Sequence, residues 1–405
     1  MNIFQELKER GFIKQLTDEE NIEKLLNEKK ISMYVGFDPT KPSMHIGHLI
    51  PIMILSHLQK AGHKPICIVG GGTAMIGDPS GKDSMRELLT PEKIDENVEG
   101  IKKQLSSFIN FEEEKALLLN NWDWIKDLNY VDFLRNIGPH FTVNRMLAAE
   151  CFKVRWEKGL TFLEFNYMLF QAYDFFYLHN NYDCNLEIGG DDQWSNIIAG
   201  IELVRRKKGE SVYGMTAPLM TNSAGKKMGK TEEGAVWIDK DLTSAYDYYQ
   251  FWRNSLDNDV VKFMKLYTFM PLDEIAKYEK LEGAELNSAK EVLAYEATKI
   301  VHGDDAAREA QEAARKVFTG GGIDGAPEVE IERSNIESMN VTDLAVEVGL
   351  FTTKGEAKRM IKQGGLSINN IKIVNFNEPV TDQFIVNNTI PMKKGKKKFI
   401  KVVLK

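Results

Sequence analysis

Two short apolar segments on either side of a helical pattern constrain the fold of this chain more than any other feature. Residues 31–37 (ISMYVGF) and 65–69 are typical of strands, and residues 44–61 are typical of a helix that Ser43 can cap and Gly62 can end. A strand, a helix and a strand in this order form a βαβ unit with parallel strands. Strand and helix patterns continue to about residue 225, which predicts an α/β fold with a Rossmann-like, doubly wound parallel sheet.

The remainder of the chain is predicted to form further domains, because 405 residues exceed one ordinary core. Helical spacing dominates from about 240 to 318, and the glycine-rich stretch 319–327 has the composition of a linker. The expected domains are 1–225 with an inserted segment at about 110–185, an α-helical domain at 226–319, a linker at 320–337 and a small α+β domain at 338–405.

Composition excludes several classes of protein. Hydrophobic residues make up 43% and charged residues 27%, which argues against a disordered or fibrous chain. The three cysteines, Cys67, Cys151 and Cys184, form no C-x-x-C pair that could hold zinc or act as a redox couple. The amino terminus does not resemble a signal peptide, and no apolar run approaches the roughly 20 residues of a membrane span. We therefore expect a cytoplasmic protein without a membrane partner.

The net charge of −7 conceals an uneven distribution along the chain. Residues 338–405 contain 12 Lys and Arg against 5 Asp and Glu, a balance of +7, so the rest of the chain carries −14. A basic terminal domain on an acidic body indicates a polyanionic partner that the terminal domain binds.

The first segment with potential chemistry is His45-Ile46-Gly47-His48, at the start of the predicted helix. Histidines three positions apart on a helix project from the same side. The helix terminus offers N–H donors that suit phosphate, and Gly47 allows a ligand to approach the backbone. Taken alone, the two histidines are as well explained as caps or surface residues.

The second segment is 225–231, in which Lys227 and Lys230 are spaced by glycine and followed by Thr231. Its ammonium groups could neutralise charge that develops on a leaving pyrophosphate. Taken alone, it is also explained as a solvated basic loop.

Further polar residues occur where strands end or helices bury a face. Residues 77–82 (GDPSGK) suggest a P-loop, but the glycine spacing is wrong and Asp83 follows the lysine, so that interpretation fails. The predicted helix at 162–174 carries a polar stripe that must find partners, either internal hydrogen bonds or a ligand. A glycine-rich turn at 189–193, between a strand and a helix, could contact a ribose or simply cap the helix.

Together, and in this order, 45–48 and 227–231 resemble the HIGH and KMSKS signatures of class I aminoacyl-tRNA synthetases, although Gly229 and Thr231 depart from the serines. The whole set of segments is similar to the tyrosyl-tRNA synthetase family, over essentially the full chain. The resemblance implies a tyrosine–tRNA ligase that converts L-tyrosine and ATP to tyrosyl-adenylate and pyrophosphate, then charges tRNA(Tyr). It also implies Mg²⁺ with ATP, no tightly bound cofactor, no protein metal site and a homodimer formed through the inserted segment.

The resemblance also implies residue roles. The tyrosine-binding residues would be Tyr34, Asp78, Tyr167, Gln171, Asp174 and Gln193, with Tyr34 and Asp174 at the phenol hydroxyl. The residues around ATP and the adenylate would be Asp38, Gly47, Gly190, Asp192 and Lys230. The catalytic residues acting on the phosphates would be Thr40, His45, His48, Lys82, Arg86, Lys227, Lys230 and Thr231. Asp191 and Val35 depart from residues common in the family, which leaves the ribose contacts open.

At 351–369 a short basic helix, a Gly-Gly turn and a strand resemble a small RNA-binding domain shared with a ribosomal protein. The resemblance implies that Lys354, Lys358, Arg359 and Lys362 contact tRNA, and the lysines of 393–398 join them or form a solvated tail. The helical domain at 226–319 would recognise the anticodon.

Three alternatives are weighed. A tryptophanyl enzyme shares both signatures but is disfavoured by Asp174 with Tyr34. A catalytically idle RNA-binding or splicing protein is disfavoured by the intact histidines and lysines of the signatures. A nucleotidylyltransferase is disfavoured by the helical and terminal domains.

Overall fold

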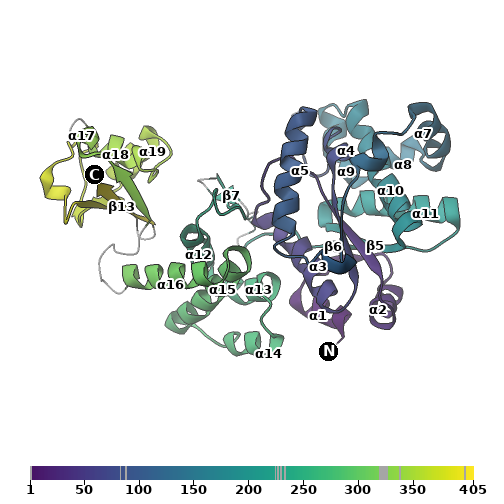
Figure 1. The fold of residues 1–405 in the computed structure, drawn as a ribbon, viewed down its shortest axis with the longest axis horizontal. Coiled ribbons are helices and arrows are strands. Elements are labelled where there is room, and N and C mark those ends of the chain that lie inside the picture. Colours follow the sequence, from purple (N-terminus) through teal and green to yellow (C-terminus); the bar gives the residue numbers. More distant parts are fainter. Residues whose placement is uncertain are drawn as a thin grey trace. The chain divides into compact units, whose positions relative to one another are not determined.

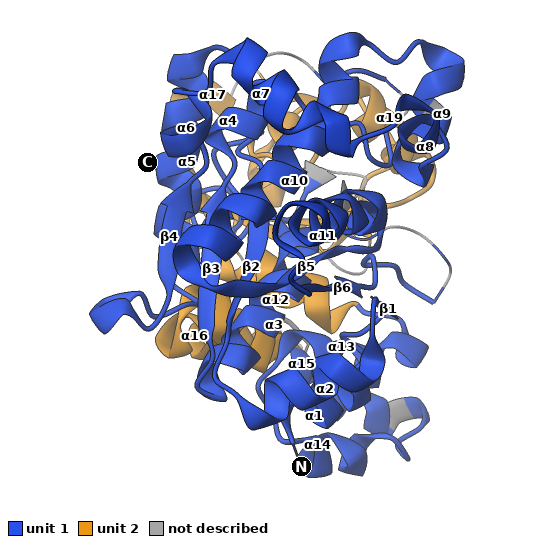
Figure 2. Cartoon of the chain, turned by 90° about the vertical axis from the view of Figure 1, so that its right-hand side faces the viewer, with its two compact units in different colours: residues 1–243, 255–293 blue, residues 244–254, 294–405 orange. Residues whose placement is uncertain are grey.

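The structure is a computed structural model that describes residues 2–82, 84–86, 89–223, 225, 228, 230–231, 234–318, 327–336, 339–395 and 398–405. The chain forms two compact units, residues 1–243 with 255–293 and residues 244–254 with 294–405 (Figure 2). The predicted helical domain at 226–319 is therefore divided between the two units, because its segment 255–293 packs with the amino-terminal residues.

The first unit is built on a six-stranded sheet in the order β1-β6-β5-β2-β3-β4. All neighbours are parallel except β1, which pairs with β6 in the antiparallel direction. The strands are β1 (Gln15–Leu16), β2 (Ser32–Phe37), β3 (Lys64–Val69), β4 (Leu117–Asn120), β5 (Cys184–Gly190) and β6 (Tyr213–Ala217). The predicted doubly wound parallel sheet is confirmed.

Helices cover both faces of this sheet (Figure 1). Because crossovers between parallel strands are right-handed, the β2-to-β3 and β5-to-β6 connections, which run outwards in opposite directions, place α3 and α11 on opposite faces. The helices of this unit are α1 (Ile3–Arg10), α2 (Glu19–Glu28), α3 (Leu49–Lys60), α4 (Gly71–Ala74), α5 (Pro91–Leu105), α6 (Trp122–Ile125), α7 (Tyr130–Asn136), α8 (Val143–Leu147), α9 (Glu150–Lys158), α10 (Phe162–Tyr182), α11 (Trp194–Lys208), α13 (Val260–Tyr267) and α14 (Leu272–Ile275).

Burial explains why α3 and α10 are the central helices. All residues of α3 from Leu49 to Leu58 except Pro51 are buried, so this helix is apolar on every side and must lie inside the protein. Helix α10 begins at a capping box between Thr161 and Glu164 and ends at Asp183, whose φ of 48° is left-handed. It is 21 residues long and carries the predicted polar stripe, which includes Tyr167.

The predicted insertion at about 110–185 contributes to the body of this unit. Edge strand β4 pairs with β3, and α10 packs against β5 and α11. Only the short helices α6 to α9 lie between these two elements along the chain.

The second unit contains helices and the carboxyl-terminal sheet. Its helices are α12 (Ala245–Arg253), the end of α15 (Leu286–His302), α16 (Asp304–Phe318), α17 (Arg333–Ile336), α18 (Val341–Glu347) and α19 (Lys354–Lys362). Its sheet has the order β11-β10-β12-β13-β9, in which only β9 and β13 are parallel. The strands are β9 (Glu328–Ile331), β10 (Leu366–Ile368), β11 (Ile371–Lys372), β12 (Thr389–Lys394) and β13 (Lys398–Leu404).

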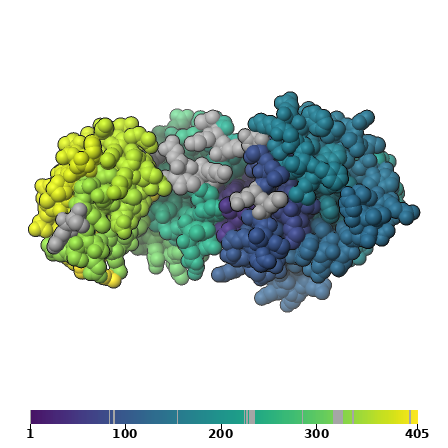
Figure 3. All heavy atoms as spheres, turned by 90° about the horizontal axis from the view of Figure 1, so that it is seen from above, coloured from purple at the N-terminus to yellow at the C-terminus, as the bar shows by residue number. Residues whose placement is uncertain are grey.

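The carboxyl-terminal residues have a core of their own and form one rounded body in the space-filling view (Figure 3). That core includes Leu344, Phe384 and Val402, each fully buried. Part of the predicted linker at 320–337 belongs to this body, because β9 pairs with β13 and α17 contributes Ile336 to the core. Across the described residues, no helix is long and apolar enough to cross a membrane.

Candidate active site

The predicted site residues surround the carboxyl ends of β2 and β5, which are neighbours in the middle of the sheet. Strand order runs outwards from this pair in both directions. In doubly wound sheets this switch point is where a ligand crevice forms. Asp38 directly follows β2, and the 3₁₀ turn Asp191–Gln193 directly follows β5.

Asp174 lies on α10 and is buried, with 4% of its surface exposed. Its Oδ1 accepts a hydrogen bond from Trp124 Nε1 at 2.8 Å, and its Oδ2 accepts one from Asn121 Nδ2 at 2.9 Å. Burial raises the pKa of Asp174 to about 8, and the nearby charges of Asp38 and Glu187 act in the same direction, whereas the two donors oppose it. The result is a carboxyl group in a fixed orientation that can share a proton with a hydroxyl.

Tyr34 lies on β2 and is also buried, with its ring 5.3 Å from that of Phe175. Its hydroxyl oxygen has no hydrogen-bond partner among the described residues. Burial and the negative charges of Glu187 and Asp174 raise its pKa well above that of a free tyrosine. The hydroxyl therefore stays protonated and can serve a polar ligand group.

Asp38 joins β2 to α10 through hydrogen bonds to its carboxylate. Its Oδ2 accepts from the Tyr167 hydroxyl at 2.8 Å, and its Oδ1 accepts from Thr73 Oγ1 at 2.7 Å. Burial raises the pKa of Asp38 to about 6, with a smaller contribution from Asp78 and opposition from the two donors. Tyr167 is thus held in place by a residue from a different part of the chain.

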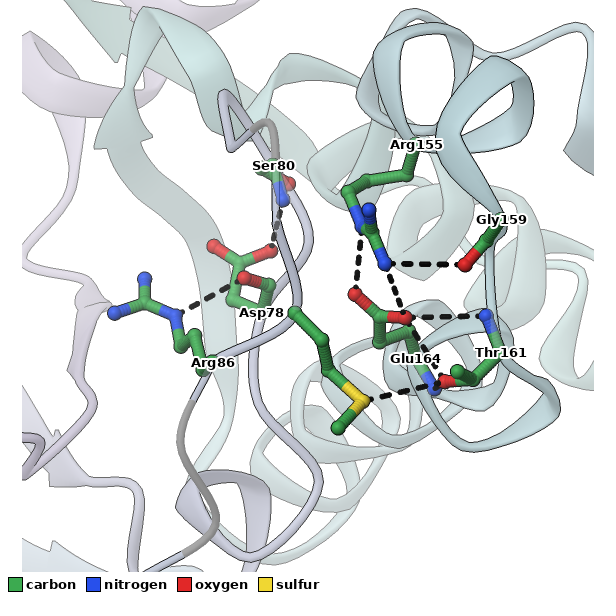
Figure 4. A network of polar contacts seen from close by, with 8 residues as sticks. Asp78, Ser80, Arg86, Arg155, Gly159, Thr161 and Glu164 are labelled. Carbon is green, nitrogen blue, oxygen red and sulfur yellow. Dashed lines mark hydrogen bonds and ion pairs between the residues drawn. The ribbon is translucent and has the colours of Figure 1, made fainter.

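Asp78 is the centre of a second group of contacts. Its Oδ1 accepts from Ser80 N at 2.9 Å, and its Oδ2 accepts from Gln193 Nε2 at 2.8 Å. Its backbone carbonyl accepts from Arg86 Nε at 3.1 Å, so Arg86 is directed back to the loop that carries Asp78 (Figure 4). Two residues expected at the amino acid, Asp78 and Gln193, are therefore in direct contact.

Gln171 lies one turn before Asp174 on α10. Its Nε2 donates a 2.9 Å hydrogen bond to Oε1 of Glu187 on β5, and its own Oε1 is buried without a partner. Burial raises the pKa of Glu187 to about 7. The predicted polar stripe of α10 thus faces the sheet and is partly satisfied by internal hydrogen bonds.

The histidines of the first signature cap their own turn. His48 Nδ1 accepts from His45 N at 3.1 Å, and His45 Nδ1 accepts from Gly47 N at 3.0 Å. The rings lie 4.2 Å apart, which confirms that they project from one side. Because each Nδ1 accepts, each ring carries its proton on Nε2. Burial lowers the pKa of His48 to about 3, so its ring is a neutral N–H donor.

The predicted start of this helix is wrong. The regular helix α3 begins at Leu49, and the signature forms a 3₁₀ turn, Ile46–His48, before it. Ser43 does not cap the helix, because its hydroxyl donates to the Met44 carbonyl. The N–H groups that a capping serine would bind are already paired, since His45 N donates to the His48 ring and Ile46 N donates to the Val236 carbonyl. Gly62, with φ of 90°, follows the end of the helix as expected.

Helix α5 holds the loop between β2 and the first signature. Asn97 Nδ2 donates to the Pro39 carbonyl at 2.9 Å, and Gln104 Oε1 accepts from Met44 N at 2.8 Å. Both side chains come from one face of α5. The loop also carries Thr40, which is half-buried and whose N–H donates to the Asp38 carbonyl at 2.8 Å.

The second signature is described only in part. Lys227 lies outside the described residues, and for Lys230 and Thr231 the structure gives the backbone alone, as strand β7 (Lys230–Thr231) paired with β8 (Gly234–Ala235). The positions of these side chains therefore stay predictions.

The segment after the second signature contacts the first. Ile46 N donates to the Val236 carbonyl and Ile238 N donates to the Met44 carbonyl, each at 3.0 Å. His45 and Trp237 are also bridge partners, with ring centroids 6.2 Å apart. The chain thus brings segments that are about 190 residues apart in sequence to the same edge of the site.

The remaining predicted residues line the rim. At Gly190 a Cβ would lie 2.7 Å from Asp192 Oδ1, so the bare glycine allows this carboxylate to fold over the end of β5. Lys82 is exposed and its N–H donates to the Pro79 carbonyl at 3.2 Å. The carboxylate of Asp191 is held by β1 and β6, since its Oδ1 accepts hydrogen bonds from Gln15 Nε2 and Thr216 Oγ1.

The predicted RNA-binding residues lie on α19 in the second unit. Lys358 and Lys362 place their ammonium groups 5.1 and 5.8 Å from the centre of the Phe376 ring. Arg359 is exposed, and Lys354 forms an ion pair with Asp343 at 2.7 Å on the surface. A helix, the turn at 364–365 and strand β10 occur as the sequence predicts.

Four residues of the site were not predicted: Thr73, Asn121, Trp124 and Glu187. The first three act through contacts with Asp38 or Asp174 that no local pattern reveals. Glu187 did leave a signal, because it is the single charge inside the apolar strand 184–188 (CNLEI). A buried carboxylate in a central strand requires a partner or a role.

Comparison with known proteins agrees with this geometry. Residues 26–319 match the family model described as tRNA synthetases class I (W and Y), and residues 320–402 match the SYY-like C-terminal domain of tyrosine–tRNA ligases. A tyrosine–tRNA ligase of Clostridium botulinum is 53% identical over 405 residues, covering 100% of this chain and 99% of that protein. One of Caldanaerobacter subterraneus is 52% identical over 406 residues, covering all of both.

A solved structure shows the same relationship. The C-terminally truncated mitochondrial tyrosyl-tRNA synthetase of Aspergillus nidulans superposes with a TM-score of 0.70 at 30% identity, over 78% of this chain and 94% of that one. The chain therefore belongs to the class I tRNA synthetases of the tryptophan and tyrosine type, among the tyrosine–tRNA ligases.

Proposed function

We propose that this chain activates L-tyrosine with ATP, forming tyrosyl-adenylate and pyrophosphate, and then transfers the tyrosyl group to tRNA(Tyr). The observation that carries the choice of tyrosine is Asp174, a buried carboxyl group held by Asn121 and Trp124 near the unpartnered Tyr34 hydroxyl. A phenol hydroxyl between Tyr34 and Asp174 would satisfy both groups. Phenylalanine would supply no hydroxyl to the buried Tyr34 and would leave Asp174 with only its two protein donors, which is costly.

The ammonium group of tyrosine is proposed to bind among Asp78, Tyr167 and Gln171, with Gln193 beside them. Asp78 and Gln171 each offer an acceptor, and Tyr167 is fixed by Asp38. This arrangement gives the amino group and the phenol separate sites at the two ends of the same helix segment.

ATP is proposed to bind over the first signature, with Asp38, Gly47, Gly190 and Asp192 around the nucleoside and adenylate. His45, His48 and Thr40 then face the phosphates. The neutral ring of His48 suits a phosphate oxygen because its Nε2–H donates without bringing a charge that must be desolvated, and the His45 ring projects from the same side. Mg²⁺ enters with ATP as part of the substrate, bound to its phosphates.

The reaction requires no general base, because the tyrosine carboxylate is already ionised at neutral pH. This carboxylate attacks the α-phosphate, the bond to the bridging oxygen breaks, and pyrophosphate leaves with the electron pair. Catalysis is therefore positioning and stabilisation of charge on the leaving group. Lys82, Arg86, Lys227, Lys230 and Thr231 are proposed to contact that group.

The carboxyl-terminal body is proposed to bind tRNA through Lys354, Lys358, Arg359 and Lys362. The balance of +7 over residues 338–405 of this body supports a polyanionic partner. The helices within 226–319 are proposed to recognise the anticodon. The carboxyl-terminal body, which contains 338–405 together with β9 and α17, is proposed as the RNA-binding domain, and the linker is proposed to begin at about residue 320. The protein is proposed to act in the cytoplasm.

A homodimer is proposed through the short helices that precede α10 and through the first turn of α10. Large apolar side chains are exposed there, including Val131 at 60%, Trp156 at 60% and Phe162 at 69%. Exposed apolar surface of this kind is typical of protein interfaces. Sedimentation equilibrium tests the proposal, and a monomer at micromolar concentration would contradict it.

The test of the activity is exchange of labelled pyrophosphate into ATP with tyrosine, tryptophan or phenylalanine as the amino acid. Exchange with tyrosine alone is expected. Exchange with tryptophan instead would assign the chain to the other enzyme of the family, and no exchange with any amino acid would refute amino-acid activation.

A further inference from the structure

Glu187 is the one buried carboxylate of the described site to which neither signature nor the family resemblance gives a role. It lies in the middle of β5 with 2% of its surface exposed. In the register of β2 and β5 it is the direct partner of Tyr34, so the two side chains lie on the same face of the sheet. A carboxylate in this position is costly unless it serves a purpose.

The surroundings of Glu187 are closed on several sides. Phe175 on α10 and Gly200 on α11 pack over it, and a Cβ on Gly200 would lie only 3.3 Å from Glu187 Oε2. A glycine in the middle of a helix is unfavourable by about 1 kcal/mol relative to alanine. The helix thus leaves room for this carboxylate.

Three polar atoms around this carboxylate are buried without a hydrogen-bond partner among the described residues. They are Glu187 Oε2, the Tyr34 hydroxyl oxygen and Gln171 Oε1. Glu187 Oε1 accepts from Gln171 Nε2 at 2.9 Å, and the nearby Tyr34 hydroxyl also interacts with this carboxylate, since it opposes the rise in the pKa of Glu187. Such a group of unsatisfied atoms is typical of a site that is completed by a ligand.

The contact between Gln171 and Glu187 determines what Gln171 can offer to that ligand. An amide has a donor end and an acceptor end, and Glu187 Oε1 accepts. Gln171 must therefore turn its NH₂ group to Glu187. Its carbonyl oxygen is then left as the acceptor at the site.

We propose that Glu187 is a positioning residue, which fixes the amide of Gln171 so that its carbonyl oxygen accepts a hydrogen bond from the ammonium group of the amino-acid substrate. This inference rests on the proposed function, since it assumes that an amino acid occupies the site. Glu187 acts through Gln171 and does not touch the reacting atoms.

The first experiment compares Glu187→Gln with Glu187→Leu in tyrosine-dependent pyrophosphate exchange. Glutamine keeps an oxygen that accepts from Gln171, so the KM for tyrosine should stay within about threefold of the native value. Leucine removes the acceptor, and the KM for tyrosine should rise by about tenfold, the usual effect of one hydrogen bond. The KM for ATP should not change in either variant.

The second experiment separates positioning from a general structural role. The ligand 3-(4-hydroxyphenyl)propionate is tyrosine without its ammonium group. Its inhibition constant is measured with the native protein and with Glu187→Leu. Glu187→Leu should leave this constant within about twofold, because the Gln171 carbonyl has no donor to meet. An equal loss for tyrosine and this analogue would overturn the proposal.

A double-mutant cycle provides the final check. On a Gln171→Ala background, Glu187→Leu should raise the KM for tyrosine by no more than about twofold further, because the residue through which it acts is gone. Independent, multiplying effects would overturn the proposal, as would native tyrosine affinity in Glu187→Leu.

A wrong role for Glu187 and a wrong proposed activity would give different results. A native protein without tyrosine-dependent exchange refutes the proposed activity. A native protein with that exchange, together with an unaffected Glu187→Leu variant, refutes only the role of Glu187. Thermal unfolding of each variant identifies loss of the fold, and Glu187→Gln remains informative if the leucine variant does not fold.

Discussion

At the scale of single residues, the polar contacts of the site depend mainly on three carboxyl groups with raised pKa values. Asp38 directly follows β2, and Asp174 and Glu187 lie on α10 and β5; burial raises the pKa of these three carboxyl groups to about 6, 8 and 7, in that order. Their partners are hydrogen-bond donors such as Trp124 and Asn121. These carboxyl groups can therefore exchange or share protons with a polar ligand.

Asp174→Ala should abolish most tyrosine activation. The change removes the acceptor for the phenol and leaves the donors of Asn121 and Trp124 unpaired, so kcat/KM for tyrosine in pyrophosphate exchange should fall by about 100-fold. The control is Asp123→Ala, which removes an exposed carboxylate from α6. Native tyrosine activity in the Asp174→Ala protein would refute the role assigned to this residue.

Stability should decline as pH rises across the neutral range. An aspartate of the unfolded chain titrates near 4, whereas Asp174 in the folded protein has a pKa of about 8. Between these values the folded state binds a proton that the unfolded chain has released. The stability from this group is therefore complete below about pH 4 and is lost progressively up to about pH 8.

Urea unfolding at pH 6 and pH 8 measures this effect. Asp38 and Glu187 change in the same direction as Asp174, so a decline remains in Asp174→Asn, but it should be smaller than in the native protein. Asp123→Asn should keep the native decline. An identical decline in Asp174→Asn would show that Asp174 is ionised in the folded protein throughout this range.

At the scale of elements, α10 carries most of the site, and a buried ion pair fixes where it begins. Arg155 on α9 binds both carboxylate oxygens of Glu164, at 2.9 and 3.0 Å, and Thr161 donates to the same carboxylate (Figure 4). Both charged side chains are at most 5% exposed. The start of α10 sets the position of Tyr167 and Gln171 further along it.

Glu164→Ala should destabilise the protein by about 3–5 kcal/mol, because it leaves the Arg155 charge buried without a partner. Thermal or urea unfolding of the full chain measures the effect. Replacing both residues with apolar ones of similar volume, Arg155→Met with Glu164→Leu, should recover part of the loss. The matched control is the exposed pair of Glu150 and Lys153, where Glu150→Ala should change stability by less than about 1 kcal/mol. Equal effects of the two alanine changes would contradict this account of the ion pair.

The elements themselves could largely be predicted from the sequence, because apolar periodicity reports burial directly. The strands at 32–37 and 64–69 occur within a few residues of their predicted positions, and the helix predicted at 162–174 begins where expected but continues to Tyr182. The helix start at Met44 was wrong because the histidine rings compete for the N–H groups that define a helix end. Local sequence pattern does not show which side chain accepts a hydrogen bond from each of these N–H groups.

The contacts of the site could be predicted only in part. Asp174 and Tyr34 were identified from the family resemblance, but the donors that hold Asp174 come from the end of β4 and from α6, about 50 residues away. The role of Glu187 depends on the register between β2 and β5 and on the absence of a side chain at Gly200 beside it. Neither contact can be predicted from local sequence pattern. The assigned roles of Lys227, Lys230 and Thr231 stay predictions.

At the scale of the whole molecule, activation and tRNA binding are assigned to different parts of the chain. The acidic amino-terminal residues form the switch-point sheet, and the carboxyl-terminal body has its own core, with a balance of +7 over its residues 338–405. The two activities should therefore respond to different mutations.

The double change Lys358→Glu with Lys362→Glu should raise the KM for tRNA in charging by about tenfold or more. It reverses two charges beside Phe376, and it should also make charging less sensitive to salt, because fewer counterions are released on binding. Pyrophosphate exchange should stay native, since it does not involve tRNA. Lys24→Glu with Lys29→Glu, at exposed sites on and after α2, is the control for total charge. An equal effect of both pairs would indicate a general charge effect and not a binding site.

The most direct measurement is the rate of pyrophosphate exchange into ATP by the native protein with tyrosine compared with phenylalanine. The pocket formed by Tyr34 and Asp174 predicts rapid exchange with tyrosine and exchange lower by orders of magnitude with phenylalanine, because phenylalanine brings no hydroxyl to hydrogen-bond with these two buried groups. Comparable rates with the two amino acids would contradict the assignment of tyrosine, and exchange with neither would contradict amino-acid activation itself.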